Sequence, residues 1–371
     1  MSKLFPIFLI AMALASVSHH RSPYDPNLCT YRRREVLAFF CMSLILVLFV
    51  GLRIHYNDTD TYRSAYENIT FQGSFLNNIS FAIGDNPGFV ITRKFFRLIG
   101  ISTQTFLLIF AAVTDGIYLW FIRKYTCNIW LSVFLFITTG SYTFTMAAIK
   151  QCVAIAFCLV GVDRAIQHRW IRFLLWIALA TVFHPYSLMF LLVPLLFFVP
   201  WSRKTYLLLV IFTAAGFLLQ PLMNTVIDVT TMLGEEYNAA TFSGEGVNPF
   251  RLAVVSVPIA LSFITKKVIW MEHNRINNLL LNLTMLNATI MFVALFGTAN
   301  YFARLANYFL IFQSLSLPWL FTHFETRSRN FITVCAVICY FLFFYYSNAI
   351  DQPFDHAYYG ISLWQYLTTL F

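Results

Sequence analysis

Charged residues are scarce in this sequence: Asp, Glu, Lys and Arg make up 11% of its 371 residues, whereas hydrophobic residues make up 59%. A soluble domain of this length would have too little polar surface to face water. The mean hydropathy of +0.69 leads to the same exclusion. The net charge of +9 does not indicate a nucleic-acid partner, because basic residues in a membrane protein mainly record its orientation.

Cysteine pairs, metal-ligand spacings and nucleotide-binding motifs are also lacking. The seven cysteines follow no pairing or metal spacing, and most lie in apolar runs, where we interpret them as packing residues. The sequence contains no P-loop, no GxSxG motif and no dinucleotide fingerprint. We therefore predict neither a metal nor an organic cofactor.

Long apolar runs dominate the chain instead. They recur from end to end, and most approach the ~20 residues that cross ~30 Å of hydrocarbon as a helix. We predict one all-α, polytopic membrane domain over residues 1–371, with about twelve transmembrane helices. The expected helices cover residues 4–17, 36–51, 102–122, 128–147, 151–166, 171–183, 187–200, 205–224, 251–265, 277–298, 305–322 and 331–347.

The basic residues orient these helices. Most of the 25 Lys and Arg residues fall in alternate loops, beginning with residues 18–35, and such loops face the cytoplasm. Both termini then lie outside, together with two longer loops over residues 52–101 and 225–250. Within the first of these, residues 89–99 combine cations with phenylalanines, which is typical of an amphipathic helix in the membrane interface.

A dense polar stretch, Gly51–Tyr66, follows the second apolar run. It contains Arg53, Asp58, Thr59 and Tyr62. In a chain this apolar, such a cluster indicates a functional site at the mouth of the preceding helix. An alternative stays open, because Asp and Thr are also favoured at the start of a helix.

Several cations are expected near the outer ends of the helices. Arg holds a phosphate through two parallel hydrogen bonds, whereas Lys acts as a point charge. A converging group of them would bind a diphosphate and stabilise it as it leaves. The alternative is that each side chain reaches up to lipid headgroups. The residues are Arg53, Lys150, Arg251 and Arg304, with Arg93, Lys94 and Arg97 in the amphipathic segment.

Two residues compete as a general base on this face. His184 ends an apolar run, and a neutral imidazole accepts a proton near pH 7, although a lone His before a proline is also a common turn residue. Asp58 is ionised at neutral pH and is a weak base unless burial raises its pKa. Asp58 is also close in sequence to Arg53, so we predict His184 as the base and Asp58 as the residue that orients Arg53. Asp115, in the middle of a helix, is interpreted as structural.

In their order along the chain, these landmarks resemble the EpsG family of Wzy-type bacterial polysaccharide polymerases. The resemblance covers about residues 36–310, and one departure is Lys150, which keeps the charge but not the planar fork of the family's common arginine. The landmarks are Arg53 with Asn57-Asp58-Thr59 and Tyr62, then Pro87-Gly88-Phe89, Lys150-Gln151 with Ala154, Phe183-His184 with Ser187-Leu188, and Tyr301-Phe302-Ala303-Arg304.

The resemblance implies a GT-C-like helical fold and a metal-independent glycosyltransferase in the bacterial inner membrane, with its site on the periplasmic face. A glycan on undecaprenyl diphosphate would be transferred onto a lipid-linked repeat unit, as in O-antigen, capsule or exopolysaccharide synthesis. Membrane lipid, a chain-length regulator and a flippase are the implied partners. The expected catalytic residues are His184, Asp58, Arg304 and Arg53, and the expected substrate-binding residues are Lys150, Gln151, Thr59, Tyr62, Arg251 and Tyr301.

Two other functions remain open. An O-antigen ligase, or another GT-C glycosyltransferase acting on lipid-linked sugars, needs the same cations and base. A transporter or flippase of lipid-linked oligosaccharide would place charged residues along a path through the bilayer. Most positions inside the expected helices are apolar, with Asp115 as the main exception, and this favours the glycosyltransferase.

Overall fold

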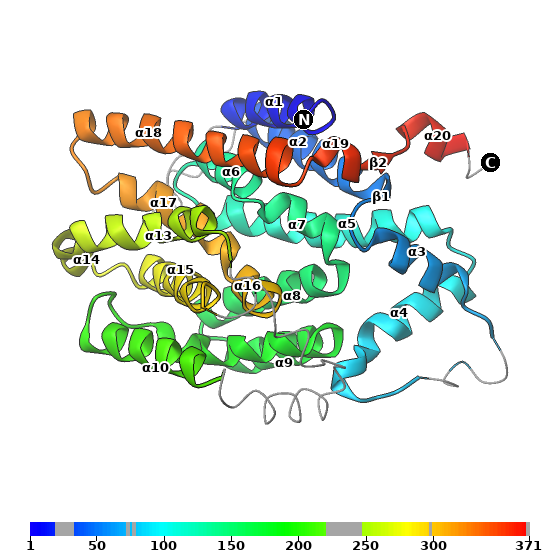
Figure 1. The fold of residues 1–371 in the computed structure, drawn as a ribbon, viewed down its shortest axis with the longest axis horizontal. Coiled ribbons are helices and arrows are strands. Elements are labelled where there is room, and N and C mark those ends of the chain that lie inside the picture. The colour runs from blue at the N-terminus through cyan, green and yellow to red at the C-terminus, as the bar shows by residue number, and fades with distance from the viewer. Residues whose placement is uncertain (19–32, 72–74, 76–78, 220–246, 297–298, 369–371) are drawn as a thin grey trace.

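The computed structural model describes residues 1–18, 33–71, 75, 79–219, 247–296 and 299–368. Helices make up nearly all of this part of the chain, as Figure 1 shows, which confirms the all-α class. Most of the predicted external loop over residues 225–250 lies outside the described residues.

Long apolar runs form the main helices of the bundle. The runs are helical because only a helix satisfies its own backbone groups in an apolar medium. Side chains of these helices pack against neighbouring helices. These helices are α1 (Leu4–Val17), α2 (Arg33–Gly51), α5 (Thr103–Tyr125), α6 (Ile129–Thr138), α7 (Ser141–Ala147), α8 (Ile149–Ile166), α9 (Trp170–Phe183), α10 (Arg203–Leu219), α13 (Pro249–Ile264), α14 (Lys266–Glu272), α15 (Arg275–Val293), α16 (Ala299–Asn307), α17 (Leu310–Phe321) and α18 (Thr326–Tyr345).

Shorter elements cover one end of the bundle. The predicted amphipathic helix over residues 89–99 is observed as α4 (Pro87–Leu98), and the polar stretch forms α3 (Thr59–Glu67), which starts where Asp58 and Thr59 were expected to begin a helix. The segment after α18 contributes most of the rest. These elements are β1 (Arg53–His55), the 3₁₀ turns η1 (Ile83–Asp85) and η2 (Pro185–Leu196), the π-helical turn η3 (Tyr346–Asp351), α19 (Phe354–Ala357), β2 (Tyr359–Gly360) and α20 (Leu363–Thr368).

The number of membrane spans differs from the predicted count of about twelve. By length and composition, four helices in the described residues are able to cross a membrane: α2, α5, α15, and α18 with its π-helical continuation. Two bent helix pairs, α6–α7 and α13–α14, raise this number to as many as six. The helices α1, α9, η2 and α17 are apolar but have only 10–17 residues. The structure supports a polytopic membrane protein and does not confirm the count of twelve.

Glycine and proline explain where long apolar runs are interrupted. Gly140 adopts a φ of +86° between α6 and α7, a left-handed conformation that costs glycine little, and the two helices meet at 50°. Pro258 lies inside α13 and has no N–H for the carbonyl of Val254, one turn earlier. That carbonyl accepts hydrogen bonds from Gln313 Nε2 and Tyr340 Oη, both at 2.9 Å.

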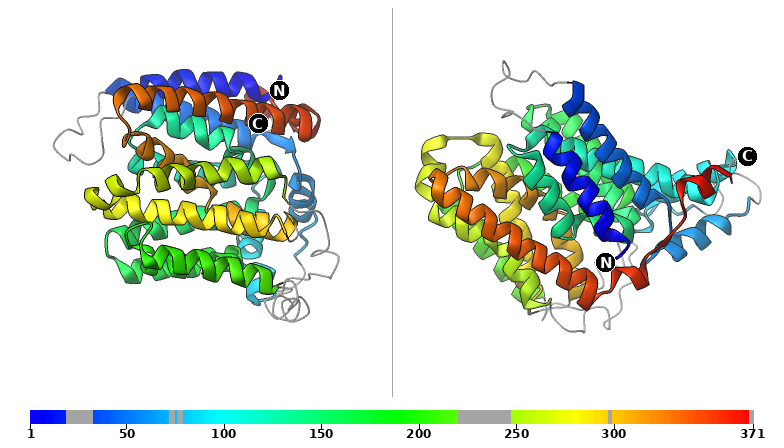
Figure 2. Two further views of the ribbon diagram at one scale, coloured as in Figure 1. Left: turned by 60° about the vertical axis from the view of Figure 1, so that its left-hand side comes forward. Right: turned by 90° about the horizontal axis from the view of Figure 1, so that it is seen from above.

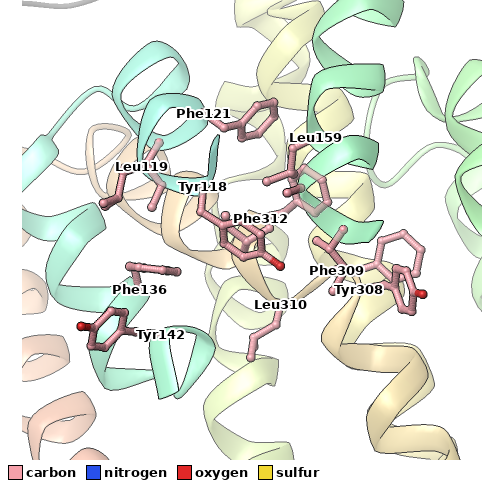
Figure 3. Packing of buried hydrophobic residues seen from close by; sticks show 14 of the residues in the cluster. Tyr118, Leu119, Phe121, Phe136, Tyr142, Leu159, Tyr308, Phe309, Leu310 and Phe312 are labelled. Atoms are coloured by element: carbon pink, nitrogen blue, oxygen red, sulfur yellow. The ribbon is translucent and has the colours of Figure 1, made fainter. Parts of the chain in front are cut away.

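The helices pack in layers that run roughly parallel to one another. Figures 1 and 2 show α1 and α18 on one face of the molecule and α9 and α10 on the opposite face, with the remaining long helices between them. Phe8 of α1 stacks on Phe344 of α18, with ring centroids 5.5 Å apart. The interior is rich in aromatic rings, and Figure 3 shows Phe136 beside Tyr142, with ring centroids 5.8 Å apart.

The segment after α18 returns to the strand that contains Arg53. β2 pairs with β1 antiparallel, with Arg53 opposite Gly360 and His55 opposite Tyr359. Tyr358 stacks on Phe49 at a centroid distance of 4.6 Å, and its hydroxyl donates to the Phe49 carbonyl at 2.9 Å. The last part of the chain therefore fixes the position of β1 from the side opposite to α3.

Candidate functional site

The polar stretch after α2 folds around the buried side chain of Arg53. A turn at Asn57, with a φ of +47°, separates β1 from α3. The Arg53 side chain is 1% exposed; its Nε donates to Thr59 Oγ1 at 3.1 Å and its Nη1 donates to the Val50 carbonyl at 2.6 Å. Burial lowers the pKa of the Arg53 guanidinium to about 10, and the charge of Asp115 opposes this effect. The guanidinium is therefore still charged at neutral pH.

Asp115 is a buried acidic residue that acts electrostatically on Arg53. It is fully buried on α5, where its Oδ1 accepts a hydrogen bond from Thr145 Oγ1 at 2.9 Å and its Oδ2 has no partner among the described residues. Of the neighbouring groups, Asp115 exerts the largest electrostatic effect on Arg53. Opposite charges attract over several ångströms in an apolar interior. Asp115 thus connects Arg53 to α5 and α7, a role that its position in the sequence does not reveal.

Asp58 occupies the N-cap position of α3 but makes no side-chain capping bond. Its carboxylate is exposed and has no hydrogen bond with the described residues. Thr59 and Val50, not Asp58, hold the guanidinium of Arg53. The structure thus places Asp58 at the predicted helix start and leaves its carboxylate accessible.

Tyr62 connects α3 to the start of α8. Its phenol makes a hydrogen bond to the backbone of Lys150, and burial raises its pKa well above the ordinary value for tyrosine. Asp58 raises the pKa of this phenol further, and the cation of Arg304 lowers it. Tyr62 therefore stays protonated at neutral pH, as a donor near both cations.

The start of α8 contacts the last part of α16. Lys150 and Gln151 lie in the first turn of α8, and Arg304 lies in the last turn of α16. Gln151 is 3% exposed, and its Nε2 donates to the backbone carbonyl of Arg304 at 2.6 Å. This bond holds α16 against the first turn of α8, which also contains Lys150. The Arg304 side chain itself is exposed. Gln151 thus positions Arg304, and Tyr301 lies one turn earlier on α16, where its side chain lies outside the described residues.

His184 lies at the link between α9 and η2, close to these cations. Its Nδ1 is 2.7 Å from the hydroxyl of Tyr308, a fully buried residue just after α16. Burial lowers the pKa of His184 to about 3, and the positive charges of Lys150 and Arg304 lower it further in the same direction. The imidazole is therefore neutral at physiological pH. Figure 3 shows the Tyr308 ring beside Phe309, at the end of the aromatic core.

Arg251 joins this group from α13. Its Nη2 donates to Asn307 Oδ1 at 3.0 Å, at the end of the helix that contains Arg304. The side chain is half-buried. Arg251 is thus connected to Arg304 indirectly, through its hydrogen bond to α16. The cations of the amphipathic helix are arranged differently: Arg97 lies over the ring of Tyr66, and Lys94 approaches the Phe75 carbonyl at 3.4 Å.

Helix α4 packs closely against the end of α9, immediately before His184. A Cβ atom added to Gly88 would lie 2.9 Å from Val182 Cγ2 and 3.0 Å from two ring carbons of Phe183. Only glycine allows this approach without a shift of the neighbouring side chains. Pro87 begins the helix directly before it. The Pro87-Gly88-Phe89 landmark therefore determines how α4 meets the segment that contains His184.

We expect Gly88→Ala to destabilise the protein by about 1–3 kcal/mol, because the added methyl overpacks the contact with Phe183. The measurement is the thermal unfolding midpoint of the purified protein in detergent. Gly116→Ala on α5 is the matched control, since its Cβ would meet nothing within 4 Å. An unchanged midpoint for Gly88→Ala would show that the contact is not tight.

The structure adds two residues that the expected site did not contain. Tyr308 and Thr145 each make a direct hydrogen bond to an ionisable group there. No sequence signal pointed to either residue, because both bonds join segments that are far apart in the chain.

The arrangement combines cations, a neutral imidazole and an accessible carboxylate in one place. Arg304 and Lys150 border His184, and Tyr62 donates nearby. Such a group is suited to bind an anion of high charge and to accept a proton beside it.

The comparisons with known proteins identify one family. The sequence model of the EpsG family matches residues 36–366. No curated protein and no solved structure matches the chain.

Proposed function

We propose, from the premise that this chain belongs to the EpsG family of Wzy-type polysaccharide polymerases, that it transfers a polyprenyl-diphosphate-linked glycan onto a lipid-linked repeat unit. The reaction takes place at the periplasmic face of the bacterial inner membrane. The observation that supports this proposal is the meeting of Lys150, Arg304 and His184, which come from α8, α16 and the end of α9.

The diphosphate of the donor binds at Arg304 and Lys150. The exposed guanidinium of Arg304 offers two parallel N–H groups to a phosphate, and Gln151 fixes its backbone at 2.6 Å. Lys150 adds a second charge beside it, and the Tyr62 phenol adds a donor. Arg53 is buried, where it bonds Thr59 and the Val50 carbonyl, so its role is to hold the start of α3 and not to contact the diphosphate.

The acceptor is the terminal sugar hydroxyl of the second lipid-linked unit. This oxygen attacks the anomeric carbon of the donor glycan, and the bond between that carbon and the diphosphate breaks. The diphosphate leaves with the electron pair and is stabilised by Arg304 and Lys150. His184 Nε2 takes the hydroxyl proton and later gives it to the departed diphosphate.

The contact with Tyr308 sets which nitrogen of His184 is available. A base at Nε2 requires that Nδ1–H donates to the Tyr308 hydroxyl, 2.7 Å away. The Tyr308→Phe substitution removes that acceptor and keeps the buried ring. We expect kcat for chain extension to fall about 10-fold or more, within the range that a positioned base contributes, with KM for the donor little changed.

The measurement is steady-state extension of a lipid-linked repeat unit by purified Tyr308→Phe and wild-type protein. The Tyr340→Phe variant is the matched control, since Tyr340 is also a buried tyrosine and bonds the Val254 carbonyl. A KM that rises with kcat unchanged would place Tyr308 in donor binding.

A ligase is the second candidate. It would use the same diphosphate site and base and would differ in the acceptor. Most buried residues of α5, α6 and α17 are apolar, with Asp115 as the one buried charged residue of these three helices. This does not favour a transporter, because a charged solute needs polar groups along its path. The family assignment favours the polymerase over the ligase.

Deletion of the gene in its source bacterium tests this proposal. Surface polysaccharide is then separated on a gel. We expect long chains to disappear while a single repeat unit remains attached. Loss of all attached glycan would favour the ligase, and unchanged chains would contradict both functions.

A further inference from the structure

Burial makes the His184 imidazole a weak base, and two cations weaken it further. Lys150 lies on α8 and Arg304 on α16, and both oppose a positive charge on the imidazole. Two tyrosines also face it, Tyr308 at a hydrogen-bonding distance and Tyr186 at a ring-centroid distance of 5.2 Å.

The same two cations form the proposed diphosphate site. A lipid diphosphate brings at least two negative charges to Lys150 and Arg304, the two cations that act electrostatically on His184. An anion next to a histidine favours its protonated form. Diphosphate binding therefore changes the base and the leaving-group site together.

We propose that the donor diphosphate activates His184: it cancels the positive field of Lys150 and Arg304, so that the imidazole accepts the proton of the sugar hydroxyl only when the donor is bound. This inference rests on the proposed function and adds an order of events to it. An acceptor without a donor is not deprotonated. A donor in place creates both the leaving group and the base.

Hydrogen bonds connect α8, α16 and the segment that contains His184. Gln151, next to Lys150, bonds the Arg304 carbonyl at 2.6 Å, and Tyr308, just after α16, bonds His184 at 2.7 Å. Asn307, between Arg304 and Tyr308, is held by Arg251 at 3.0 Å. Anion binding at Arg304 and the orientation of His184 thus share one short segment, residues 304–308.

The test is the titration of His184 by NMR in protein labelled with ¹⁵N-histidine, in nanodiscs of phosphatidylcholine. His184→Gln identifies the signal. Without added anion, we expect His184 to stay neutral down to about pH 4, since its pKa lies near 3. With saturating inorganic pyrophosphate, we expect its midpoint to rise by about 1–3 pH units.

Pyrophosphate binding is followed separately by the ³¹P signal. Binding without any shift of His184 would overturn this inference and leave the proposed function standing. No binding at all would count against the diphosphate site, on which both depend. A shift caused by nanodiscs of phosphatidylglycerol alone would assign the effect to lipid headgroups and would also overturn it.

Two variants separate the cations from general effects. Arg304→Gln and, independently, Lys150→Gln are each expected to raise the midpoint of His184 without anion and to shrink the shift caused by pyrophosphate. Arg327→Gln, an exposed arginine at the start of α18, is the matched control and should leave both values unchanged. An unchanged shift in both site variants would contradict the proposal.

Discussion

Arg304→Lys is expected to lose about 10²–10³-fold in kcat for chain extension, the effect of removing a donor that stabilises charge in a transition state. The exposed guanidinium of Arg304 presents a planar pair of N–H groups to the leaving diphosphate, whereas an ammonium keeps the charge and loses that fork. Gln151 bonds the backbone carbonyl of residue 304 and not the Arg304 side chain, so the substitution preserves the position of α16. The measurement is steady-state extension with purified protein of verified folding.

Arg53→Lys provides the contrast to this result. Arg53 is 1% exposed, and two of its nitrogens bond Thr59 and Val50. Lys cannot make both bonds, so we expect lower stability together with lower activity. Arg304→Lys should lose activity at unchanged stability. Full activity in both variants would reduce the two arginines to structural or headgroup contacts, and Arg327→Gln serves as the control for charge alone.

His184→Gln is expected to lower kcat by about 10²–10⁴-fold, the contribution of a positioned general base. Gln keeps a polar side chain near Tyr308 but takes up no proton. Asp58→Asn should cost much less, because the Asp58 carboxylate is exposed and does not hold the Arg53 guanidinium, which bonds Thr59 and Val50. The measurement is chain extension across pH, with expression of each variant verified.

The pH dependence distinguishes the two candidates. Burial lowers the pKa of His184 to about 3, so protonation removes the free base only well below neutral pH. In the donor complex, we expect the acid limb of kcat to lie at higher pH than the acid limb of kcat/KM. If His184→Gln retained near-normal extension while Asp58→Asn retained none, the two roles would have to be exchanged.

The fold class follows from the sequence, but the membrane spans do not. Apolar runs predict helices because no other structure satisfies the backbone in lipid, and α2, α5 and α15 begin within a few residues of the expected positions. Counting runs fails where a helix breaks internally. Gly140 divides one expected span into α6 and α7, and residues 305–322 divide into α16 and α17.

The sequence indicated candidate residues for the site but not the contacts between them. Arg53, Lys150, Arg304 and His184 were identifiable because charge near an apolar run is costly. Their contacts depend on tertiary structure: nothing in the sequence places Asp115 near Arg53, or Tyr308 at His184. The pairing of β1 with residues 359–360 was also beyond local patterns, since the partners are far apart in the chain.

Extension of a synthetic lipid-linked repeat unit by the purified protein tests the central claim most directly. The reaction contains only the protein in lipid nanodiscs and one substrate, the repeat unit on undecaprenyl diphosphate. We predict a ladder of glycans that increases by one repeat unit at a time, with one undecaprenyl diphosphate released for each new bond, and no ladder with Arg304→Lys. Folded wild-type protein that releases no undecaprenyl diphosphate and forms no chains would contradict the account.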